Sequence, residues 1–469
     1  MRLALLPTLP LLLLLVACSG EDIKDASDTG DTGGDTDSGG DSDTSDSDTS
    51  DTDTGSSIPD AECVDEGGAC VLTGEYTQSM RLTADKPWLL RSGVLIGDDT
   101  NETVLEVDPG TWIYGESSTG GVMIIRRGSR IEAVGTAQDP IVFTSDQAIG
   151  SRSRGDWGGL VLNGRAPINA CTDGTSPCEA EGEGNTGTYG GDDWADNSGT
   201  LNYVIVEFGG TEISPDNEIN GISLQAAGSG TQLDYVQIHN TLDDCIEFWG
   251  GAAQVKHLVC TSPGDDGIDY DLGFQGKIQF AVVQQAWGTG NNGFEGDNNP
   301  DVHTAEPGTT PTISNVTLIG EDDVAESNFG MLLRRGIHAD ISNVAVDGFS
   351  TGCLALRDQA TYDGYTSGTA AMNHAVFACN VPFEESADET ETGTEEGVFG
   401  AGTGNQLVAD LGLKDPFNVA APDFRLDAGS PLSTGGQVPG DSFFESVPYI
   451  GAFDASTDWT AGWTHHDAN

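Results

Sequence analysis

Acidic residues recur in a similar pattern in three short segments of the chain. The first reads Asp243-Asp-Cys-Ile-Glu247, and Asp265-Asp-Gly-Ile-Asp269 repeats its pattern 22 residues later. The segment 291–297, Asn-Asn-Gly-Phe-Glu-Gly-Asp, continues the pattern after another 26 residues. Clustered carboxylates can bind Ca²⁺, which takes six to eight oxygen ligands at about 2.3–2.6 Å.

The spacing predicts how these acids stack. If the segments are successive coils of a parallel solenoid, equivalent positions lie about 4.8 Å apart, one strand spacing. Asp244 then lies over Asp266, and Asp269 lies between Glu247 and Glu295. Carboxylates this close repel and raise one another's pKa, and a bound cation removes that conflict. We therefore predict a Ca²⁺ site with ligands drawn from Asp244, Glu247, Asp266, Asp269, Asp271, Glu295 and Asp297.

Two other interpretations of the acids remain open. Asp is favoured in turns, so the residues can be solvated turn acids without an ion. Alternatively, two carboxylates at a suitable separation can hydrolyse a glycoside. Closely ringed acids favour calcium, whereas separated acids in a loop-walled groove beside a base favour an enzyme. Lys256 and Lys277 are the only Lys or Arg residues between 240 and 300, and we assign no role to Arg334 and Arg335, so no neutralising partner is predicted.

Aromatic residues accompany the acids. We interpret Phe248 and Phe294 as core residues. Trp249, Tyr270 and Trp287 are candidates for stacking on sugar rings if they are exposed. None of the seven histidines is predicted to be a ligand.

The elements that position these residues are short strands in a repeat. One strand family occupies residues 201–206, 233–238, 255–259, 278–283, 313–318, 341–346 and 372–377. A second alternates with it at residues 221–224, 244–248, 266–269, 292–295, 330–333 and 352–356. Repeat units that touch only their neighbours are typical of a solenoid, and the shortest spacings, near 22 residues, predict one coil each.

The same pattern extends toward the N-terminus, with candidate strands at residues 89–96, 103–107, 112–114 and 122–125. The 65 glycines supply tight corners, and residues 405–413 are the one short helix predicted. Insertions at 163–200, 284–311 and 380–397 interrupt the coils, and such loops commonly carry binding surfaces. The fold predicted is all-β, a right-handed parallel β-helix over residues 61–469 with a C-terminal cap.

Several phrases carry a family resemblance. Residues 129–145 and 156–162 resemble bacterial surface proteins of the pectate-lyase-like parallel β-helix class, and residues 423–431, 449–453 and 458–463 look like the phrases that close uncharacterised β-helix lipoproteins. The resemblance implies the fold and is almost silent on function.

Enzymes of this fold offer a partial match to the acidic segments. Residues 264–269 and 243–246 look like the acidic motifs of polygalacturonase-type glycosidases. That family also uses a Gly-His-Gly and an Arg-x-Lys motif after the acids, and neither follows them here. Lyases of the fold use an Arg or Lys base beside calcium. The resemblance therefore leaves catalysis open, and we predict no catalytic residue.

The N-terminus carries an export signal. A basic start is followed by an apolar run that ends in Leu15-Val-Ala-Cys18, too short to span a bilayer. The quartet resembles the bacterial lipobox, in which Cys18 becomes the acylated first residue. Residues 1–17 are then a lipoprotein signal peptide, with a plain signal peptide as the alternative. No Asp follows Cys18, which in the enteric rule permits transport to the outer membrane.

A spacer follows the anchor. Residues 18–60 are nearly all Asp, Ser, Thr and Gly, with 14 acidic residues and one Lys between 21 and 60. This composition predicts a disordered tether. The whole chain has a net charge of −58, which excludes nucleic acid as a partner because the phosphates would be repelled.

The cysteines fit an exported protein. Besides Cys18 there are eight, and we predict pairing between close neighbours, although the sequence alone leaves other connectivities open. The predicted pairs are Cys63 with Cys70, Cys171 with Cys178, Cys245 with Cys260, and Cys353 with Cys379.

These observations predict an outer-membrane or cell-surface lipoprotein, held in the bilayer by Cys18, that binds a polysaccharide or a surface protein with the help of Ca²⁺ and is not an enzyme. A carbohydrate-active hydrolase or lyase is the first alternative, and a purely structural surface protein is the second.

Overall fold

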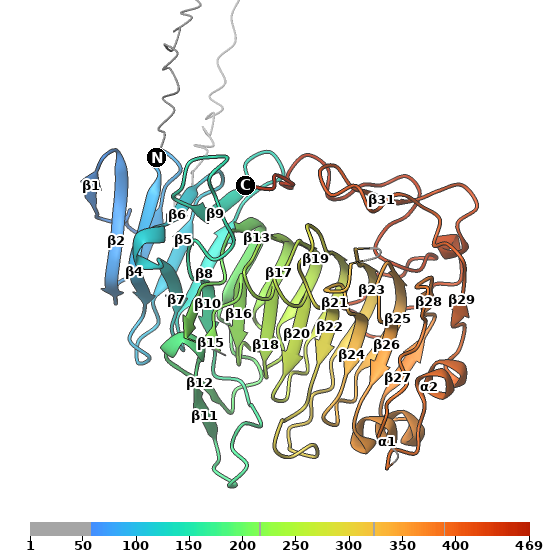
Figure 1. Ribbon diagram of the computed structural model, residues 1–469. Coiled ribbons are helices and arrows are strands. Elements are labelled where there is room, and N and C mark those ends of the chain that lie inside the picture. Colours follow the sequence, from blue (N-terminus) through green and yellow to red (C-terminus); the bar gives the residue numbers. More distant parts are fainter. Residues whose placement is uncertain (1–57, 215–216, 322–323, 389) are drawn as a thin grey trace, which may run out of the picture. The chain divides into compact units, whose positions relative to one another are not determined.

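A computed structural model describes residues 58–214, 217–321, 324–388 and 390–469 (Figure 1). The predicted signal peptide, Cys18 and the tether up to residue 57 lie outside the described residues. Within the described part, 25 strands form one hydrogen-bonded system. Its strands pair in parallel except for β1 (Val64–Glu66), which runs antiparallel to β2 (Ala69–Tyr76) at the N-terminal end. The right-handed parallel β-helix is therefore confirmed.

Each complete coil contributes to three parallel ladders. Ladder one joins β3 (Met80–Leu82), β5 (Val104–Val107), β8 (Arg130–Val134) and the first halves of β13 (Gly199–Glu207), β17 (Gln232–His239), β19 (Gln254–Thr261), β21 (Lys277–Gln284), β23 (Thr312–Ile319) and β25 (Asp340–Asp347), ending on β27 (Ala371–Asn373). Ladder two joins the first halves of β2 and β4 (Trp88–Ile96), then β6 (Trp112–Gly115), β9 (Ile141–Ser145), the second halves of β13 to β25, β28 (Val376–Phe377) and β29 (Gln406–Leu407).

Ladder three carries the acidic segments. It joins the second halves of β2 and β4 to β7 (Val122–Ile125), β10 (Gly159–Asn163), β16 (Ile222–Gln225), β18 (Ile246–Trp249), β20 (Ile268–Asp271), β22 (Asn292–Gly296), β24 (Phe329–Leu333) and β26 (Gly352–Leu356). Inward side chains from all three ladders fill the interior, and Ile246, Ile268 and Phe294 are fully buried there.

One residue bends each long strand from ladder one into ladder two. This corner has a positive φ although it is never glycine between β13 and β25, for example 47° at Tyr203 and 53° at Tyr235. Left-handed backbone is unfavourable for such residues, and stacking of equivalent side chains along the corner offsets part of the cost. The Tyr203 and Tyr235 rings lie 4.5 Å apart, and Tyr235 lies 4.2 Å from His257.

The C-terminal segment does more than cap the coils. Residues 408–469, which we call the strap, run back along the outside of ladder two (Figure 1). Its Phe424, Phe453 and Trp463 pack on an outward apolar row that includes Ile205 and Val282. The C-terminal end of the coils is instead closed by Phe399 of α2 (Glu395–Ala401), which packs on Phe377.

Helices were the weakest part of the prediction. The helix predicted at 405–413 is wrong: Gln406 and Leu407 form β29 on β28, because the open ladder edge offers backbone partners there. The described residues contain two α-helices instead, α1 (Gln359–Ser367) and α2. No helix in this described part has the length and apolar character needed to span a membrane.

The four disulfides join the predicted close neighbours: Cys63 with Cys70, Cys171 with Cys178, Cys245 with Cys260, and Cys353 with Cys379. The third links a ladder-three turn to the end of β19 across the interior of one coil. It therefore lies directly beneath the acidic segments.

Candidate metal centre

The acids stack in the predicted register on the outer face of ladder three. Glu247 pairs with Asp269, and Asp269 pairs with Glu295, on successive strands. The row is bounded by Ser223 on one side and Leu332 on the other. Alternation along a strand turns neighbouring side chains to opposite faces, so these acids point outward while the residues beside them fill the core. Three consecutive coils thus present one carboxylate each.

A second row lies at the turn before the strands. The Asp266 N–H donates to Asp244 Oδ1 at 2.7 Å, and the Asn292 N–H donates to Asp266 Oδ1 at 2.6 Å. Asn220 starts the series by accepting from the Asp244 N–H at 3.1 Å. Each side chain therefore satisfies the backbone of the next coil, which fixes the spacing of the row. Asp244 and Asp266 are buried, at 6% and 3% exposed.

The two rows converge on Asp269. Ligand oxygens of Asp244, Glu247 and Asp269 lie within 4.8 Å of one another, as do those of Asp266, Asp269 and Glu295. Oδ1 of Asp269 is buried and has no hydrogen-bond partner among the described residues. A buried carboxylate oxygen without a partner is costly. This donor set of oxygens alone fits Ca²⁺ better than a softer transition metal.

Asp271 extends the centre along the same strand. Its Oδ1 is also buried without a partner in the described part of the chain. It does not belong to either triad, but the charge of Asp297 is, after burial, the largest cause of the raised pKa of Asp271, so the two carboxylates lie near each other. Asp271 is therefore a candidate for an outer ligand, reached through water or by a small shift.

Asp297 is paired with two arginines from the next coil. Its Oδ1 accepts from Arg334 Nε at 2.8 Å, and its Oδ2 accepts from Arg335 at 2.6 Å. Arg334 also pairs with Glu295. Both oxygens of Asp297 are thus occupied, and the expectation that no basic residue neutralises the cluster is wrong. This contact was hard to predict from the sequence. β22 and β24 are neighbours in ladder three, but a long insertion separates them along the chain.

Electrostatics confirm that the centre is crowded with negative charge. Burial, followed by repulsion from the neighbouring carboxylates, raises the pKa well above the usual range for Asp244, Glu247, Asp266, Asp269 and Asp271. Burial also raises the pKa of Glu295, although Arg334 opposes the shift. Neighbouring carboxylates here therefore disfavour one another's charged forms, and a bound cation would favour the charged forms.

Sequence reasoning left further acids out of the ligand set. Asp243, Asp244 and Asp265 bring ligand oxygens within 4.8 Å of one another at the outer rim. Burial and nearby acids raise the pKa of Asp243 to about 7, and the same causes raise that of Glu183 to about 7. The 22-residue offset between Asp243 and Asp265 was available in the sequence. Glu183 belongs to the insertion at 163–200, so no repeat pattern in the sequence predicts its position near these acids.

The insertion at 163–200 covers this face. Its β11 (Cys178–Glu181) and β12 (Thr188–Gly191) form a hairpin that holds Cys171 and Cys178. Tyr189 packs with Ile168 and Trp249 in a small apolar cluster. Asn169 donates to Asn298 at 2.8 Å, so the first insertion is tied to the second. The acids lie beneath these covers rather than in an open groove.

The predicted sugar-stacking residues do not form a surface. Tyr270 is fully buried and packs on Phe274 and Phe294 in the core, because it alternates with the outward Asp269 and Asp271. Trp249 is 6% exposed beneath the first insertion. Neither ring has a face free for a sugar, so both predictions are wrong. Trp287 is 40% exposed and remains available, and Phe248 and Phe294 are core residues as predicted.

Comparison with known proteins defines the class. Residues 74–416 match the pectate-lyase-like β-helix domain family, and the chain belongs to this family. No curated protein and no solved structure was found to match the chain. Four disulfides and this fold are consistent with an extracellular protein with a surface or carbohydrate-related role.

Proposed function

We propose that this protein is a calcium-dependent surface lipoprotein that binds a glycan or another surface component without catalysing a reaction. Ca²⁺ would be held by Asp244, Glu247, Asp266, Asp269 and Glu295, with Asp271 beyond them. The ion would lock three coils together and fix the two insertions above them. The binding surface would then be made by those insertions, which the ion keeps in place.

One observation carries the proposal: Asp269 lies at the meeting point of two carboxylate triads, and its buried Oδ1 has no partner in the described residues. A cation supplies the missing partner and removes the repulsion. A structural β-helix without an ion would need another way to offset five stacked carboxylates. Arg334 reaches only the Glu295 end of the row.

The arrangement favours binding over catalysis. The acids of each triad approach one another closely instead of facing each other across a substrate groove, and hydrolysis of a glycoside needs the two carboxyls about 5–9.5 Å apart. Arg334 is a poor base: burial lowers its pKa, but the hydrogen bond and charge of Asp297 outweigh this and raise the pKa above the usual range. A base with a raised pKa holds its proton more firmly.

A polysaccharide lyase or glycoside hydrolase is the second candidate, because Arg334 and Arg335 lie beside the acids. The discriminating assay incubates the purified protein with acidic and neutral polysaccharides in millimolar Ca²⁺. We expect retention of a polysaccharide without new reducing ends or unsaturated products. Release of either product, lost in Arg334→Ala, would replace our proposal by the enzyme.

The calcium test uses thermal unfolding. A ligand that binds only the native state stabilises it by about 2.7 kcal/mol at a hundredfold excess over Kd. Chelation should lower the melting temperature, millimolar Ca²⁺ should restore it, and Mg²⁺ should act weakly because it demands a smaller octahedral site. The double variant Asp266→Asn with Asp269→Asn should lose the difference, whereas Asp43→Asn with Asp46→Asn in the tether should keep it. If Ca²⁺ and Mg²⁺ raise the melting temperature equally, and the double variant responds in the same way, the acids do not form a Ca²⁺ site. The protein would then be interpreted as a purely structural surface protein.

The anchor is the remaining part of the proposal. Cys18 would be acylated and the acidic tether would hold the β-helix away from an outer membrane. More than one acyl chain gives stable anchoring, since each buried methylene contributes about 0.8 kcal/mol. Cys18→Ser should move the protein from the membrane to the soluble fraction. Complete retention with membranes in that variant would show that the anchor assignment is wrong.

A further inference from the structure

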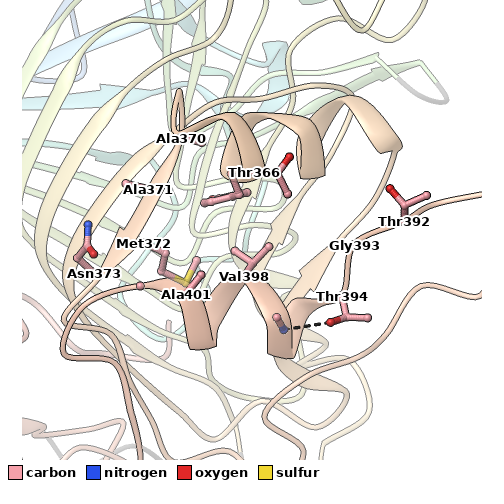
Figure 2. Close-up of a pocket in the computed structure, with 13 residues that line it drawn as sticks. Thr366, Ala370, Ala371, Met372, Asn373, Thr392, Gly393, Thr394, Val398 and Ala401 are labelled. Carbon is pink, nitrogen blue, oxygen red and sulfur yellow. Dashed lines mark hydrogen bonds between the residues drawn. The ribbon is translucent and has the colours of Figure 1, made fainter.

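A cavity lies far along the chain from the acids, at the C-terminal end of the coils. Its volume is about 550 Å³, and it opens between α1, α2 and β27 (Figure 2). Ligand pockets for small molecules commonly span about 300–1,000 Å³. Both α-helices of the described chain are inserted between strands, and together they wall this one space.

The lining of the cavity is uncharged. Met372, Val398 and Ala401 lie together in the close-up, with Ala370 and Ala371 nearby (Figure 2). Thr366, Asn373, Thr392 and Thr394 supply hydroxyl and amide groups around them. No Asp, Glu, Lys, Arg or His is among the lining residues, although the chain carries a net charge of −58. An apolar surface with a few polar groups around it is suited to a neutral ligand.

The wall formed by residues 392–394 is held on both sides. On one side Glu391 accepts from the Asp358 N–H at 2.6 Å. On the other, Glu395 is fully buried and accepts from the Leu356 N–H at 2.9 Å. Thr394 caps α2 by accepting from the Gly397 N–H at 3.0 Å (Figure 2). These contacts tie the wall to β26, so the cavity is preformed and does not need a ligand to create it.

We propose that this cavity binds a small uncharged molecule with a mainly apolar body, such as a neutral aromatic or acyl compound. Burying an ionised group here would be unfavourable, because no lining residue can pair with it. The negative charge of the whole protein further disfavours an anion. Met372 adapts the apolar surface to ligands of different outline, since its side chain is flexible. The site is independent of the calcium centre and of the proposed surface role.

The test compares two fluorescent probes of similar ring structure. N-phenyl-1-naphthylamine is uncharged, and 8-anilinonaphthalene-1-sulfonate carries a sulfonate. The full chain is used with Cys18→Ser, so that no acyl chain takes up the probe. We expect saturable binding of the neutral probe with one site per chain, and binding of the anionic probe at least tenfold weaker.

Variants locate the site. Ala401→Trp fills the cavity from an exposed position, and Ala371→Asp places a charge in its wall; each should weaken binding of the neutral probe at least tenfold. Ala461→Trp, exposed on the strap, should leave binding unchanged. Circular dichroism and melting temperature verify that each variant is folded. Absence of saturable binding, equal affinity for both probes, or binding that survives both cavity variants would overturn the proposal.

Discussion

Two outer faces of the same coils are built from opposite chemistry. On ladder two, the outward row of Ile205, Val259 and Val282 is apolar and lies beneath the strap. On ladder three, the outward row of Glu247, Asp269 and Glu295 is acidic and lies beneath an insertion. The inward residues of both ladders fill one common core. Because the buried core already stabilises the coil, the outward-facing rows can differ in chemistry. The chemistry of each row then determines which kind of segment can pack over it.

The contrast also separates two ways of holding a cover in place. The strap buries aromatic rings on the apolar row, so the hydrophobic effect retains it. The insertions over the acidic row are held by hydrogen bonds such as that from Asn169 to Asn298, above carboxylates that repel one another. The first cover is retained by apolar burial, whereas under our proposal a cation would add stability to the second.

The largest effect is expected on the strap side. Trp463 is 3% exposed and packs edge-on against Tyr203 at 5.6 Å. Trp463→Ala should lower the free energy of unfolding by about 3–5 kcal/mol, since it removes a large buried side chain and leaves a cavity. Urea unfolding measures the loss. Trp194→Ala, at a residue that is 37% exposed, is the control and should cost far less; an equal cost would mean that the strap contributes little.

On the acidic side, the effect of one substitution on the free energy of unfolding should have opposite signs with and without Ca²⁺. Without Ca²⁺, Asp269→Asn removes a charge from both triads and should stabilise the protein, because like charges on directly opposite residues of paired strands are unfavourable, by about 0.2–1 kcal/mol. With saturating Ca²⁺ the same change removes a ligand and should destabilise it. Denaturant unfolding in chelator and in Ca²⁺ gives the two values. Destabilisation under both conditions would show that Asp269 is not strained by its neighbours.

The pH dependence of the unfilled centre follows from the raised pKa values. Asp243 and Glu183 have pKa values of about 7 in the folded protein, above those of unfolded chains. Their protonated forms are favoured in the folded state, so this stabilisation is present at low pH and is lost as pH rises through about 7. In chelator the melting temperature should therefore fall between pH 5 and pH 8. Under our proposal Ca²⁺ binds deprotonated carboxylates, so its stabilising effect should grow over the same range; a constant effect would argue against a Ca²⁺ site among these acids.

The smallest effect is expected at Glu395, which anchors the 392–394 wall of the neutral cavity without lining it. Burial, followed by the contact with Glu385, raises the pKa of Glu395 to about 7. Its contribution is also lost as pH rises through that value. Glu395→Gln keeps the acceptor for the Leu356 N–H without a charge, so the variant should match the wild type at pH 5 and exceed its melting temperature slightly at pH 8. If the variant and the wild type have identical melting curves at both pH values, Glu395 is not the group whose ionisation changes the stability.

Much of the calcium centre was predictable because repeat spacing is a local property of the sequence. The 22-residue offset placed Glu247 over Asp269, and strand alternation could also have excluded Tyr270 from the surface. The observed register pairs Asn292 with Phe329 and Gly296 with Leu333, which brings Arg334 next to Asp297, whereas the alignment of 292–295 with 330–333 was displaced by one residue. The burial of Trp249 could not be predicted in this way, since no pattern near it in the sequence indicates that Ile168 and Tyr189 cover it.

The sequence by itself determined the parallel coil and the stacking of the acids, since both depend on residues that repeat along the chain, and it favoured the neighbouring disulfides without fixing them. Tertiary structure alone decided where the irregular segments lie. The strap runs back along the outside of the coils. The first insertion folds over the acids, and α1 and α2 line a neutral cavity. These contacts join residues that share no repeat and are selected by complementary surfaces, so no pattern along the chain records them.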